Sequence, residues 1–328
     1  MLARLGLAAL LLSIAACGST QQATKDDLPP LRVGSDTWAG SGPIYIAAER
    51  SLFSQMGVDV EVVHYTNYNQ SMTDLVSREL DGAHTVFSDG IAQAAAGIPV
   101  QLVWVLNSSN GADVLVGNSA IGDLEALKGK RVGMTLGSFS QLFVMSELRE
   151  RGFQDSDITL VNVIAENVPR AIAAGEIDAG HTWDPYLSEV IAAGGTALFT
   201  SADAPGVIVD TLFFQNSVLE ERPQDIQAFL QAFTNAQKWW AENPDEGNQI
   251  VAKAMGITVE ELIAIQAGLH TFSLEDNRQA FDPNNTSELS VYQSGQLAID
   301  LFLDFDVIEE APTLDDIINP SFVQAVTQ

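Results

Sequence analysis

The sequence predicts an α/β protein of two lobes, and three observations support this prediction. The chain has 328 residues, which is more than one hydrophobic core usually serves. Short apolar segments alternate with segments of helical periodicity, a pattern typical of parallel strands joined by helices. Two short motifs recur at almost the same offset, which indicates a second unit of related topology. With 46% hydrophobic and 18% charged residues, the chain is typical of a globular protein.

The N-terminus has the pattern of a secretory segment that is removed. Met1–Ala16 carries one positive charge, at Arg4, followed by an apolar run that is shorter than the roughly 20 residues needed to span a bilayer. The run ends at Cys17, the only cysteine, and this boundary resembles the bacterial lipoprotein signal, in which the cysteine is lipidated and becomes residue one. An ordinary signal with an incidental cysteine is the alternative. We expect residues 1–16 to be a signal peptide, Cys17 to be lipidated, and the polar residues 17–30 to be a flexible tether.

Two pairs of motifs relate the halves of the remaining chain. Leu31–Ser35 is echoed by Lys130–Met134 at an offset of 99, and Glu79–Thr85 by Glu176–Thr182 at an offset of 97. The nearly equal offsets predict two lobes of related topology.

The second pair of motifs also predicts roles for individual residues. It places His84 and His181 at matching positions inside strands, where we expect buried structural roles. Asp81 and Asp178 precede these strands and are expected to be turn residues.

Strands and helices are predicted in the same alternating order in each half. Beyond about residue 216 the pattern changes to long helices, which are expected to pack on the first lobe. The expected strands are Leu31–Gly34, Val58–His64, Ala83–Phe87, Gln101–Leu106, Arg131–Met134, Ile158–Val163 and Ala179–Thr182. The expected helices are Ile44–Leu52, Tyr68–Leu80, Ile91–Ala96, Phe139–Arg151, Pro169–Ala174, Pro223–Asn243 and Thr258–Leu269.

Charge and cysteine content exclude several classes of function. The chain has 15 Lys and Arg against 43 Asp and Glu, a formal net charge of −28. Nucleic acids and anionic lipid surfaces both bind through clustered basic residues, so neither is expected as a partner. One cysteine excludes an intrachain disulfide and a cysteine-based zinc cage, and no metal site is expected.

Catalytic motifs are missing from the sequence. It contains no G-x-S-x-G, no G-x-x-x-x-G-K-[ST] and no H-E-x-x-H pattern, so we expect neither an enzyme nor a bound cofactor. Asp89 and Asp184 could face one another as a carboxylate pair, but no motif supports acid–base catalysis by them. Ligand binding is the favoured interpretation of the two residues, and solvated turn carboxylates are the alternative.

Candidate ligand-binding residues follow the carboxyl ends of the predicted strands, where open α/β sheets bind their ligands, and one more, Asp210, lies on a predicted crossing between the lobes. Ser138 and Gln141 form a capping-box pattern, so a helix cap and a ligand contact both remain open for Ser138. The candidates share hydrogen-bonding or stacking capacity for a small polar solute. They are Trp38, Ser88, Asp89, Asn107, Ser138, Phe139, Ser140, Trp183, Asp184 and Asp210.

Several segments together carry a family resemblance. They are Thr37–Gly40, Pro43–Ala47, Leu124–Gly133, Gly175–Ala179 and Trp183–Tyr186. In order and spacing they resemble the solute-binding proteins of the nitrate/taurine/alkanesulfonate group of ABC transporters, a group to which thiamine-pyrimidine-precursor binders are similar. The resemblance covers roughly residues 31–250.

The resemblance implies a two-lobed periplasmic-binding-protein fold (type II-like), in which each lobe is a mixed sheet flanked by helices and two crossing strands form a hinge. We expect the crossings near Val114–Gly117 and Val207–Phe214. Lobe I would then be residues 31–115 plus 209–328, and lobe II residues 116–208.

The resemblance also implies partners and a location. A permease and an ATPase would be the protein partners of a monomeric binding protein. It would work in the periplasm or on the outer face of the cytoplasmic membrane, and would contact the membrane only through Cys17.

Charge at the candidate site predicts the class of solute. The candidate loops contain no Lys or Arg, so an inorganic anion would meet uncompensated carboxylates. An amine could pair with Asp89 or Asp184 and stack on a tryptophan, while an anionic end could sit at the N–H groups of residues 138–140. We therefore expect a zwitterion of the taurine type first, then a cationic amine, guanidine or pyrimidine precursor, and an inorganic anion last.

Two alternatives to a transport protein remain. Fungal thiamine-pyrimidine synthases resemble the same fold group, but they carry a Cys-rich iron-binding run, whereas the only cysteine here is Cys17. The other alternative is a tethered sensor domain that reports its ligand to a membrane partner.

Overall fold

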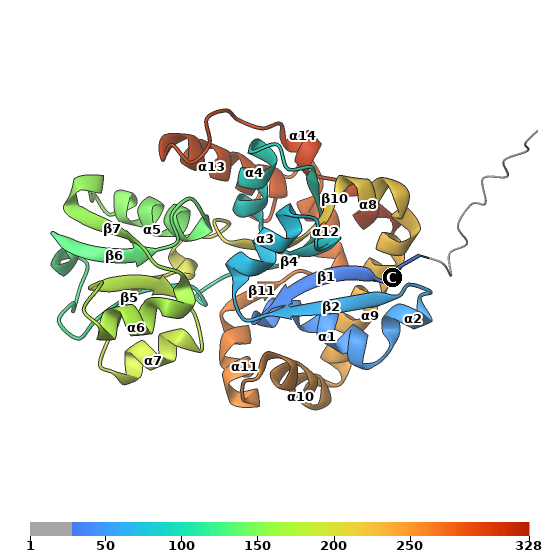
Figure 1. Cartoon of the computed structure of the whole chain (residues 1–328), viewed down its shortest axis with the longest axis horizontal. Coiled ribbons are helices and arrows are strands. Elements are labelled where there is room, and N and C mark those ends of the chain that lie inside the picture. Colours follow the sequence, from blue (N-terminus) through green and yellow to red (C-terminus); the bar gives the residue numbers. More distant parts are fainter. Residues whose placement is uncertain (1–27, 328) are drawn as a thin grey trace, which may run out of the picture.

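The computed structural model describes residues 28–327, so the predicted signal peptide, Cys17 and most of the predicted tether lie outside the described residues. Two separate sheets organise the chain into two lobes (Figure 1). We call the part built on the first sheet lobe I (residues 28–109 and 209–327) and the part built on the second sheet lobe II (residues 114–200). The predicted division into two α/β lobes is confirmed.

Lobe I contains a mixed six-stranded sheet in the order β11-β4-β10-β3-β1-β2. β1 pairs in parallel with both β2 and β3, whereas β10 is antiparallel to β3 and β4. The strands are β1 (Leu31–Asp36), β2 (Val60–Tyr65), β3 (Gly82–Val86), β4 (Val100–Ser109), β10 (Val209–Gln215) and β11 (Leu269–Thr271).

Lobe II contains a mixed five-stranded sheet in the order β7-β6-β8-β5-β9. Its central pairing repeats that of lobe I: β6 is parallel to β7 and β8, and β5 is antiparallel to β8. The strands are β5 (Val114–Gly117), β6 (Lys130–Met134), β7 (Ile158–Asn162), β8 (Ala179–Thr182) and β9 (Thr196–Thr200).

The internal repeat predicted from the motifs is confirmed in atomic detail. In lobe I the N–H of Arg32 donates to Asp81 Oδ2 at 2.8 Å, and in lobe II the N–H of Arg131 donates to Asp178 Oδ2 at 2.9 Å. Asp81 therefore holds the turn before β3 and Asp178 the turn before β8, as predicted. His84 is buried in β3 and His181 in β8, at equivalent positions.

Helices connect the strands and cover the sheets. In lobe I they are α1 (Gly42–Glu49), α2 (Leu52–Gln55), α3 (Tyr68–Val76) and α4 (Phe87–Ala95), and in lobe II α5 (Phe139–Glu150), α6 (Val168–Ala173) and α7 (Tyr186–Ala192). Short 3₁₀ turns lie at Ala39–Ser41, Glu125–Leu127, Asp155–Asp157, Ala165–Asn167 and Ser201–Asp203. α3 ends before the predicted Leu80 because Arg78 has a φ of +63°, which breaks helical geometry and starts the turn into β3.

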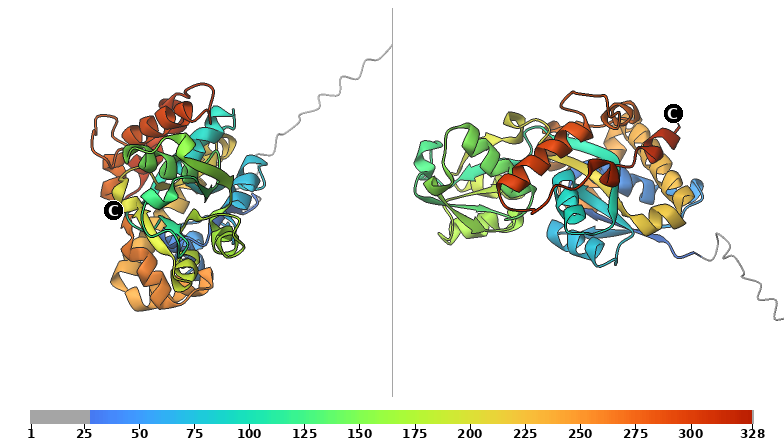
Figure 2. Two further views of the ribbon diagram at one scale, coloured as in Figure 1. Left: turned by 90° about the vertical axis from the view of Figure 1, so that its left-hand side faces the viewer. Right: turned by 90° about the horizontal axis from the view of Figure 1, so that it is seen from above.

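The segment after β10 is helical, as predicted, and it also reaches lobe II. Its helices are α8 (Asn216–Glu221), α9 (Pro223–Glu242), α10 (Pro244–Met255), α11 (Val259–Ala267), α12 (Leu274–Ala280), α13 (Val291–Asp304), α14 (Leu314–Ile317) and α15 (Pro320–Ala325). Figure 2 shows α13 lying across the junction of the lobes, where it contacts α4 and α5. Arg149 of α5 pairs with Asp304 at the end of α13.

The chain passes between the two sheets twice, and these linkers differ from the predicted crossings. Residues 110–113 join β4 to β5, and residues 201–208 join β9 to β10. The predicted crossing Val114–Gly117 is instead β5 of lobe II, and most of the other predicted crossing is β10 of lobe I, because each strand has full backbone pairing inside its own sheet. The linkers contact each other, since Ser201 Oγ accepts a hydrogen bond from the N–H of Gly111 at 2.8 Å.

Among residues 28–327, none of the helices combines the length and the apolar character that crossing a membrane requires.

α9 provides a large part of the lobe I core. Its apolar face is buried, and Phe229, fully buried, stacks on Phe53 of α2 at a ring-centroid distance of 5.1 Å. The predicted packing of this helix on the first lobe is confirmed, and Trp239 at the end of the helix is half-buried under the guanidinium of Arg50.

We expect Phe229→Ala to lower the free energy of unfolding by about 3–5 kcal/mol, because it removes a buried ring and leaves a cavity. Ile263→Ala, at a side chain that is 50% exposed, is the control and should change it by less than about 0.5 kcal/mol. Urea denaturation followed by circular dichroism measures both changes. Equal effects of the two substitutions would contradict the assignment of α9 to the core.

Candidate functional site

A cavity lies between the lobes, where strand ends from both sheets meet the linkers. It is lined by Asp36, Thr37, Trp38, Tyr68, His84, Val86, Asp113, Phe139, Trp183, Ile208 and Asp210. Its volume of about 20 Å³ is close to the space of a single water. A larger solute therefore enters only if the lobes or the lining side chains move apart.

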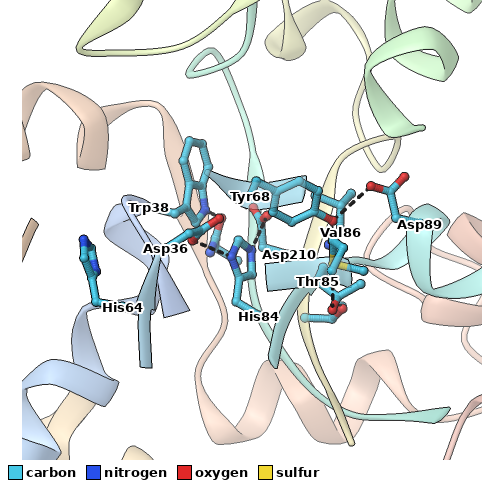
Figure 3. Close-up of polar contacts among 12 residues, drawn as sticks. Asp36, Trp38, His64, Tyr68, His84, Thr85, Val86, Asp89 and Asp210 are labelled. Atoms are coloured by element: carbon cyan, nitrogen blue, oxygen red, sulfur yellow. Dashed lines mark hydrogen bonds and ion pairs between the residues drawn. The ribbon is translucent and has the colours of Figure 1, made fainter. Parts of the chain in front are cut away.

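The centre of the lobe I wall is a buried His84 between two carboxylates. Its Nδ1 lies 2.8 Å from Asp36 Oδ1 and its Nε2 lies 2.9 Å from Asp210 Oδ1 (Figure 3). Burial opposes the charged ring, but the two carboxylates outweigh it and raise the pKa of His84 to about 10. Burial raises the pKa of Asp210 to about 6. At neutral pH this group is an imidazolium that joins β1, β3 and β10.

Lobe II holds the equivalent histidine differently. His181 Nε2 lies 3.0 Å from Asp113 Oδ1, and its Nδ1 lies 2.7 Å from Ser140 Oγ. Asp210 stands opposite Val86 in its ladder, and Asp113 directly precedes Val114, which stands opposite Thr182. Asp113 is therefore the repeat equivalent of Asp210, whereas a serine hydroxyl replaces the second carboxylate.

The hydrogen-bonded series Ser140–His181–Asp113 has the residue types of a hydrolase triad, but its serine is not accessible to a substrate. Ser140 Oγ is the acceptor of the Thr135 N–H at 3.2 Å, and Ser140 is buried and is not part of the cavity lining. A nucleophile must reach the scissile bond of a substrate, and this hydroxyl does not reach the cavity. The arrangement orients the carboxylate of Asp113 instead.

Asp89 links the two lobes beside the cavity. Its Oδ1 accepts the N–H of Phe139, the first residue of α5, at 2.7 Å, and its Oδ2 accepts the hydroxyl of Tyr68 at 3.0 Å. Burial raises the pKa of Asp89 to about 7. The next N–H of α5, from Ser140, donates to Ser138 Oγ at 3.2 Å, so Ser138 is the helix cap. The N-terminus of α5 is thus occupied by the chain's own oxygens.

Aromatic side chains from both lobes form the remaining wall. Trp38 of lobe I meets Trp183 of lobe II edge-on at a centroid distance of 6.3 Å. Phe139 lies 6.2 Å from Trp183 and 5.8 Å from Tyr68. Trp38 is held by its Nε1, which donates to Asn107 Oδ1 at 3.3 Å. These rings offer π faces and edges to a solute, and the interface between the lobes runs between them.

The structure places the sequence-predicted site residues in three groups. Trp38, Phe139, Trp183 and Asp210 line the cavity, while Ser88, Asp89, Asn107, Ser138 and Ser140 are buried and are not part of its lining. Asp184 lies elsewhere: its Oδ1 accepts the N–H and the hydroxyl of Ser188 at 3.0 and 2.6 Å and so holds the start of α7. It lines a separate surface hollow beside Gly111 and Gly268.

The candidate list missed five polar lining residues, namely Asp36, Thr37, Tyr68, His84 and Asp113. His84 was predicted to be buried and is buried, but its role as the charged centre of the site depends on Asp210, which is distant in sequence. The matching positions of His84 and His181 were the available signal, because they marked the two places where equivalent strands carry the same polar residue.

Within residues 28–327, no group of three or more His, Cys, Asp or Glu side chains has an arrangement that could hold a metal ion.

Comparison with known proteins identifies the family of the chain. A model of the NMT1-like family matches residues 24–256. The chain belongs to the NMT1-like family.

The proteins similar in sequence to this NMT1-like chain include binding proteins and a group of enzymes. A protein named putative aliphatic sulfonates-binding protein from Bacillus subtilis is 28% identical over 253 residues, which cover 73% of this chain and 74% of the relative. A 4-amino-5-hydroxymethyl-2-methylpyrimidine phosphate synthase from Saccharomyces cerevisiae is 26% identical over 222 residues, which cover 62% and 64% of the two chains.

A solved structure shows the same fold. The periplasmic aliphatic sulphonate binding protein of Escherichia coli superimposes with a TM-score of 0.71 at 22% identity, covering 89% of this chain and 92% of that one. The two-lobed periplasmic-binding-protein fold expected from the resemblance is confirmed.

We expect His84 to stay protonated at pH 8, where an ordinary histidine is neutral, because its pKa is about 10. Since the pKa in the folded state exceeds the unfolded value of about 6.5, the stabilisation by His84 is complete below pH 6.5 and is lost as the pH rises towards 10. ¹⁵N NMR of the imidazole rings measures the protonation directly.

Substitution tests the same assignment through stability. His84→Gln should lower the free energy of unfolding at pH 6 by about 3–5 kcal/mol, because it leaves two buried carboxylates without their cation. The difference in unfolding free energy between wild type and variant should become smaller towards pH 10. The control is His270→Gln, at an exposed histidine, which should have little effect at either pH. A neutral His84 ring at pH 8 would show that the carboxylates do not hold the proton.

Proposed function

We propose that this chain is the extracytoplasmic solute-binding component of an ABC importer, anchored to the membrane by lipid on Cys17. It captures a small polar organic solute in the cavity between its lobes. The observation that carries this proposal is the composition of the cavity wall, which takes residues from both lobes and both linkers. A site built in this way binds and releases its solute as the lobes move, so occupancy changes the shape that a permease would contact.

The comparisons support the transport class. The relative from Bacillus subtilis is named for binding aliphatic sulfonates, and the structural neighbour from Escherichia coli is a periplasmic binding protein. Proteins of this kind deliver solute to a membrane permease driven by an ATPase, and we assign the same partners here. We place the protein in the periplasm or on the outer face of the cytoplasmic membrane, as a monomer.

Closure of the lobes would use the two linkers as a hinge. Residues 110–113 and 201–208 are the connections between the sheets in the described part of the chain. The Asp89–Phe139 hydrogen bond joins the lobes on the cavity side, and its 2.7 Å length is typical of a charge-assisted hydrogen bond. Opening would separate Trp38 from Trp183 and enlarge the cavity.

The contacts at α5 discriminate between the two favoured solute types. A zwitterion of the taurine type needs a place for its sulfonate, and the N–H groups at residues 138–140 were the expected place. Phe139 N–H donates to Asp89 and Ser140 N–H to Ser138, so neither is available in this conformation. We therefore rank a cationic amine or guanidine ahead of the zwitterion, and an inorganic anion last.

An enzymatic function has less support. The yeast relatives are synthases, but the only cysteine of this chain is Cys17, so the chain lacks the Cys-rich run of the fungal thiamine-pyrimidine synthases. The serine of the Ser140–His181–Asp113 series is buried and is not part of the cavity lining. Binding without chemical conversion is the function that the site supports best.

Solute binding should close the lobes. We expect the mature chain to bind at least one of taurine, methanesulfonate, nitrate, methylguanidinium or ethanolamine in calorimetry, with a higher melting temperature and a smaller radius of gyration in solution scattering. Trp183→Ala should weaken binding by about 2- to 30-fold, because it removes one aromatic wall.

Trp239→Ala, at a half-buried tryptophan outside the cavity, is the matched control and should leave affinity unchanged. Tight binding with an unchanged scattering profile would contradict closure. Deletion of the gene should abolish uptake of the solute that binds, and unimpaired uptake would contradict the transport function.

We also predict that the mature protein begins at an acylated Cys17. The physical reason is the short apolar run that ends at the only cysteine of the chain. Mass spectrometry of the N-terminal peptide from the membrane fraction reads the modification, and Cys17→Ser should release the protein into the soluble fraction. Cleavage at another residue, or an unmodified Cys17, would refute the anchor.

A further inference from the structure

Two carboxylate oxygens of the cavity wall have unused hydrogen-bonding capacity. Asp113 Oδ2 and Asp210 Oδ2 are buried and have no hydrogen-bond partner within residues 28–327, and both residues line the cavity. Each side chain is held in place through its other oxygen, by His181 at 3.0 Å and by His84 at 2.9 Å. A buried carboxylate oxygen without a donor costs free energy, so both oxygens are set to accept hydrogen bonds from a solute.

The position of the two residues relates them to the hinge. Asp113 is the last residue of the first linker, and Asp210 is the second residue of β10, directly after the second linker. They are also repeat equivalents in the two sheets. A solute that donates to both would therefore bridge the two lobes at the point where the chain crosses between them.

The charge of the wall selects the sign of the solute. Three aspartates line the cavity, Asp36, Asp113 and Asp210, and the only lining group that can carry positive charge is His84. One imidazolium balances one carboxylate, and the lining contains no Lys or Arg. An excess of buried negative charge is stabilised by a cation and opposes an anion.

The aromatic walls of the cavity also favour a solute of positive charge. Trp38, Phe139 and Trp183 surround the space, and aromatic faces attract cations. The N-terminus of α5, where an anionic group was expected to bind, already donates to the carboxylate of Asp89.

We propose that the cavity selects organic solutes of net positive charge whose cationic group carries at least two N–H bonds. Primary ammonium, amidinium and guanidinium groups meet this requirement. One N–H is donated to Asp113 Oδ2 and another to Asp210 Oδ2. This inference rests on the proposed solute-binding function and names the class of its substrate. It excludes quaternary ammonium compounds, which have no N–H, and zwitterions, whose anionic end finds no donor.

Matched ligands test the inference on the wild-type chain. Ethanolamine, choline and taurine share a two-carbon backbone: the first has N–H bonds and net positive charge, choline lacks the N–H bonds, and taurine adds an anionic group. In calorimetry of the mature protein, together with methylguanidinium, agmatine and benzamidinium, at least one N–H cation should bind. Choline and taurine should each bind at least 10-fold more weakly than the best N–H cation.

Matched variants test the two oxygens. Asp113→Asn and Asp210→Asn should each weaken the best N–H cation by about 10- to 100-fold, because each replaces a charge-assisted hydrogen bond. Asp59→Asn removes the same charge at an exposed residue before the amino end of β2, on the sheet edge opposite the cavity, and should not change affinity. Melting curves identify any variant that fails to fold, and the ligand comparison above needs no variant.

Three results would overturn the inference. They are binding of choline or taurine as tight as that of every N–H cation, no binding of any N–H cation, and equal affinity of the folded aspartate variants and the Asp59 control. Tight taurine binding with lobe closure would overturn this substrate class but support the proposed function. Unimpaired uptake after gene deletion would remove the proposed function whatever the calorimetry shows.

Discussion

The buried imidazolium of His84 is the interaction on which the rest of the site depends. Asp36 ends β1, Asp210 is the second residue of β10, and His84 lies in β3 between them, so one charged ring joins three neighbouring strands. Burying two carboxylates without a cation would be strongly unfavourable. The ring therefore stabilises the edge of the sheet where the lobes meet, and it orients the free oxygen of Asp210 towards the cavity.

The two lobes repeat one another, and the site arises from the place where the repeat is imperfect. Each lobe has a buried histidine, in β3 or in β8, and an aspartate on the adjacent antiparallel segment. Lobe I adds Asp36 to this pair, whereas lobe II adds the neutral Ser140. A pair of identical walls would make the junction symmetric. The substitution of a hydroxyl for a carboxylate leaves two different walls and an uneven distribution of negative charge around the cavity.

Aromatic packing and Asp89 explain why the lobes fit together in this conformation. Trp38 and Trp183 come from different lobes and meet edge-on, and Asp89 crosses the interface to the first N–H of α5. α13 adds a third connection on the outside through Arg149 and Asp304. A junction closed by aromatic rings, the Asp89–Phe139 hydrogen bond and the outer Arg149–Asp304 pair combines shape selection with contacts that can break and form again when the lobes open.

The sequence by itself determined the fold class, the internal repeat and the general place of the site. Hydrophobic periodicity and the echoed motifs are local properties, and a strand end is local too, so Trp38, Phe139, Trp183 and Asp210 could be selected from the pattern alone. The strands of the linker regions were also recognised, but not the sheet to which each belongs, because pairing in a sheet is decided by distant partners.

Only the tertiary structure decided which polar groups meet. Asp184 follows Trp183 directly, yet its backbone turns into α7 and takes the carboxylate away from the cavity. Asp113 and His84, by contrast, acquire their roles from His181 and Asp210, which are 68 and 126 residues away along the chain. The charge and hydrogen-bonding state of a buried group is set by the atoms packed around it, and those atoms come from segments whose proximity exists only in the folded chain.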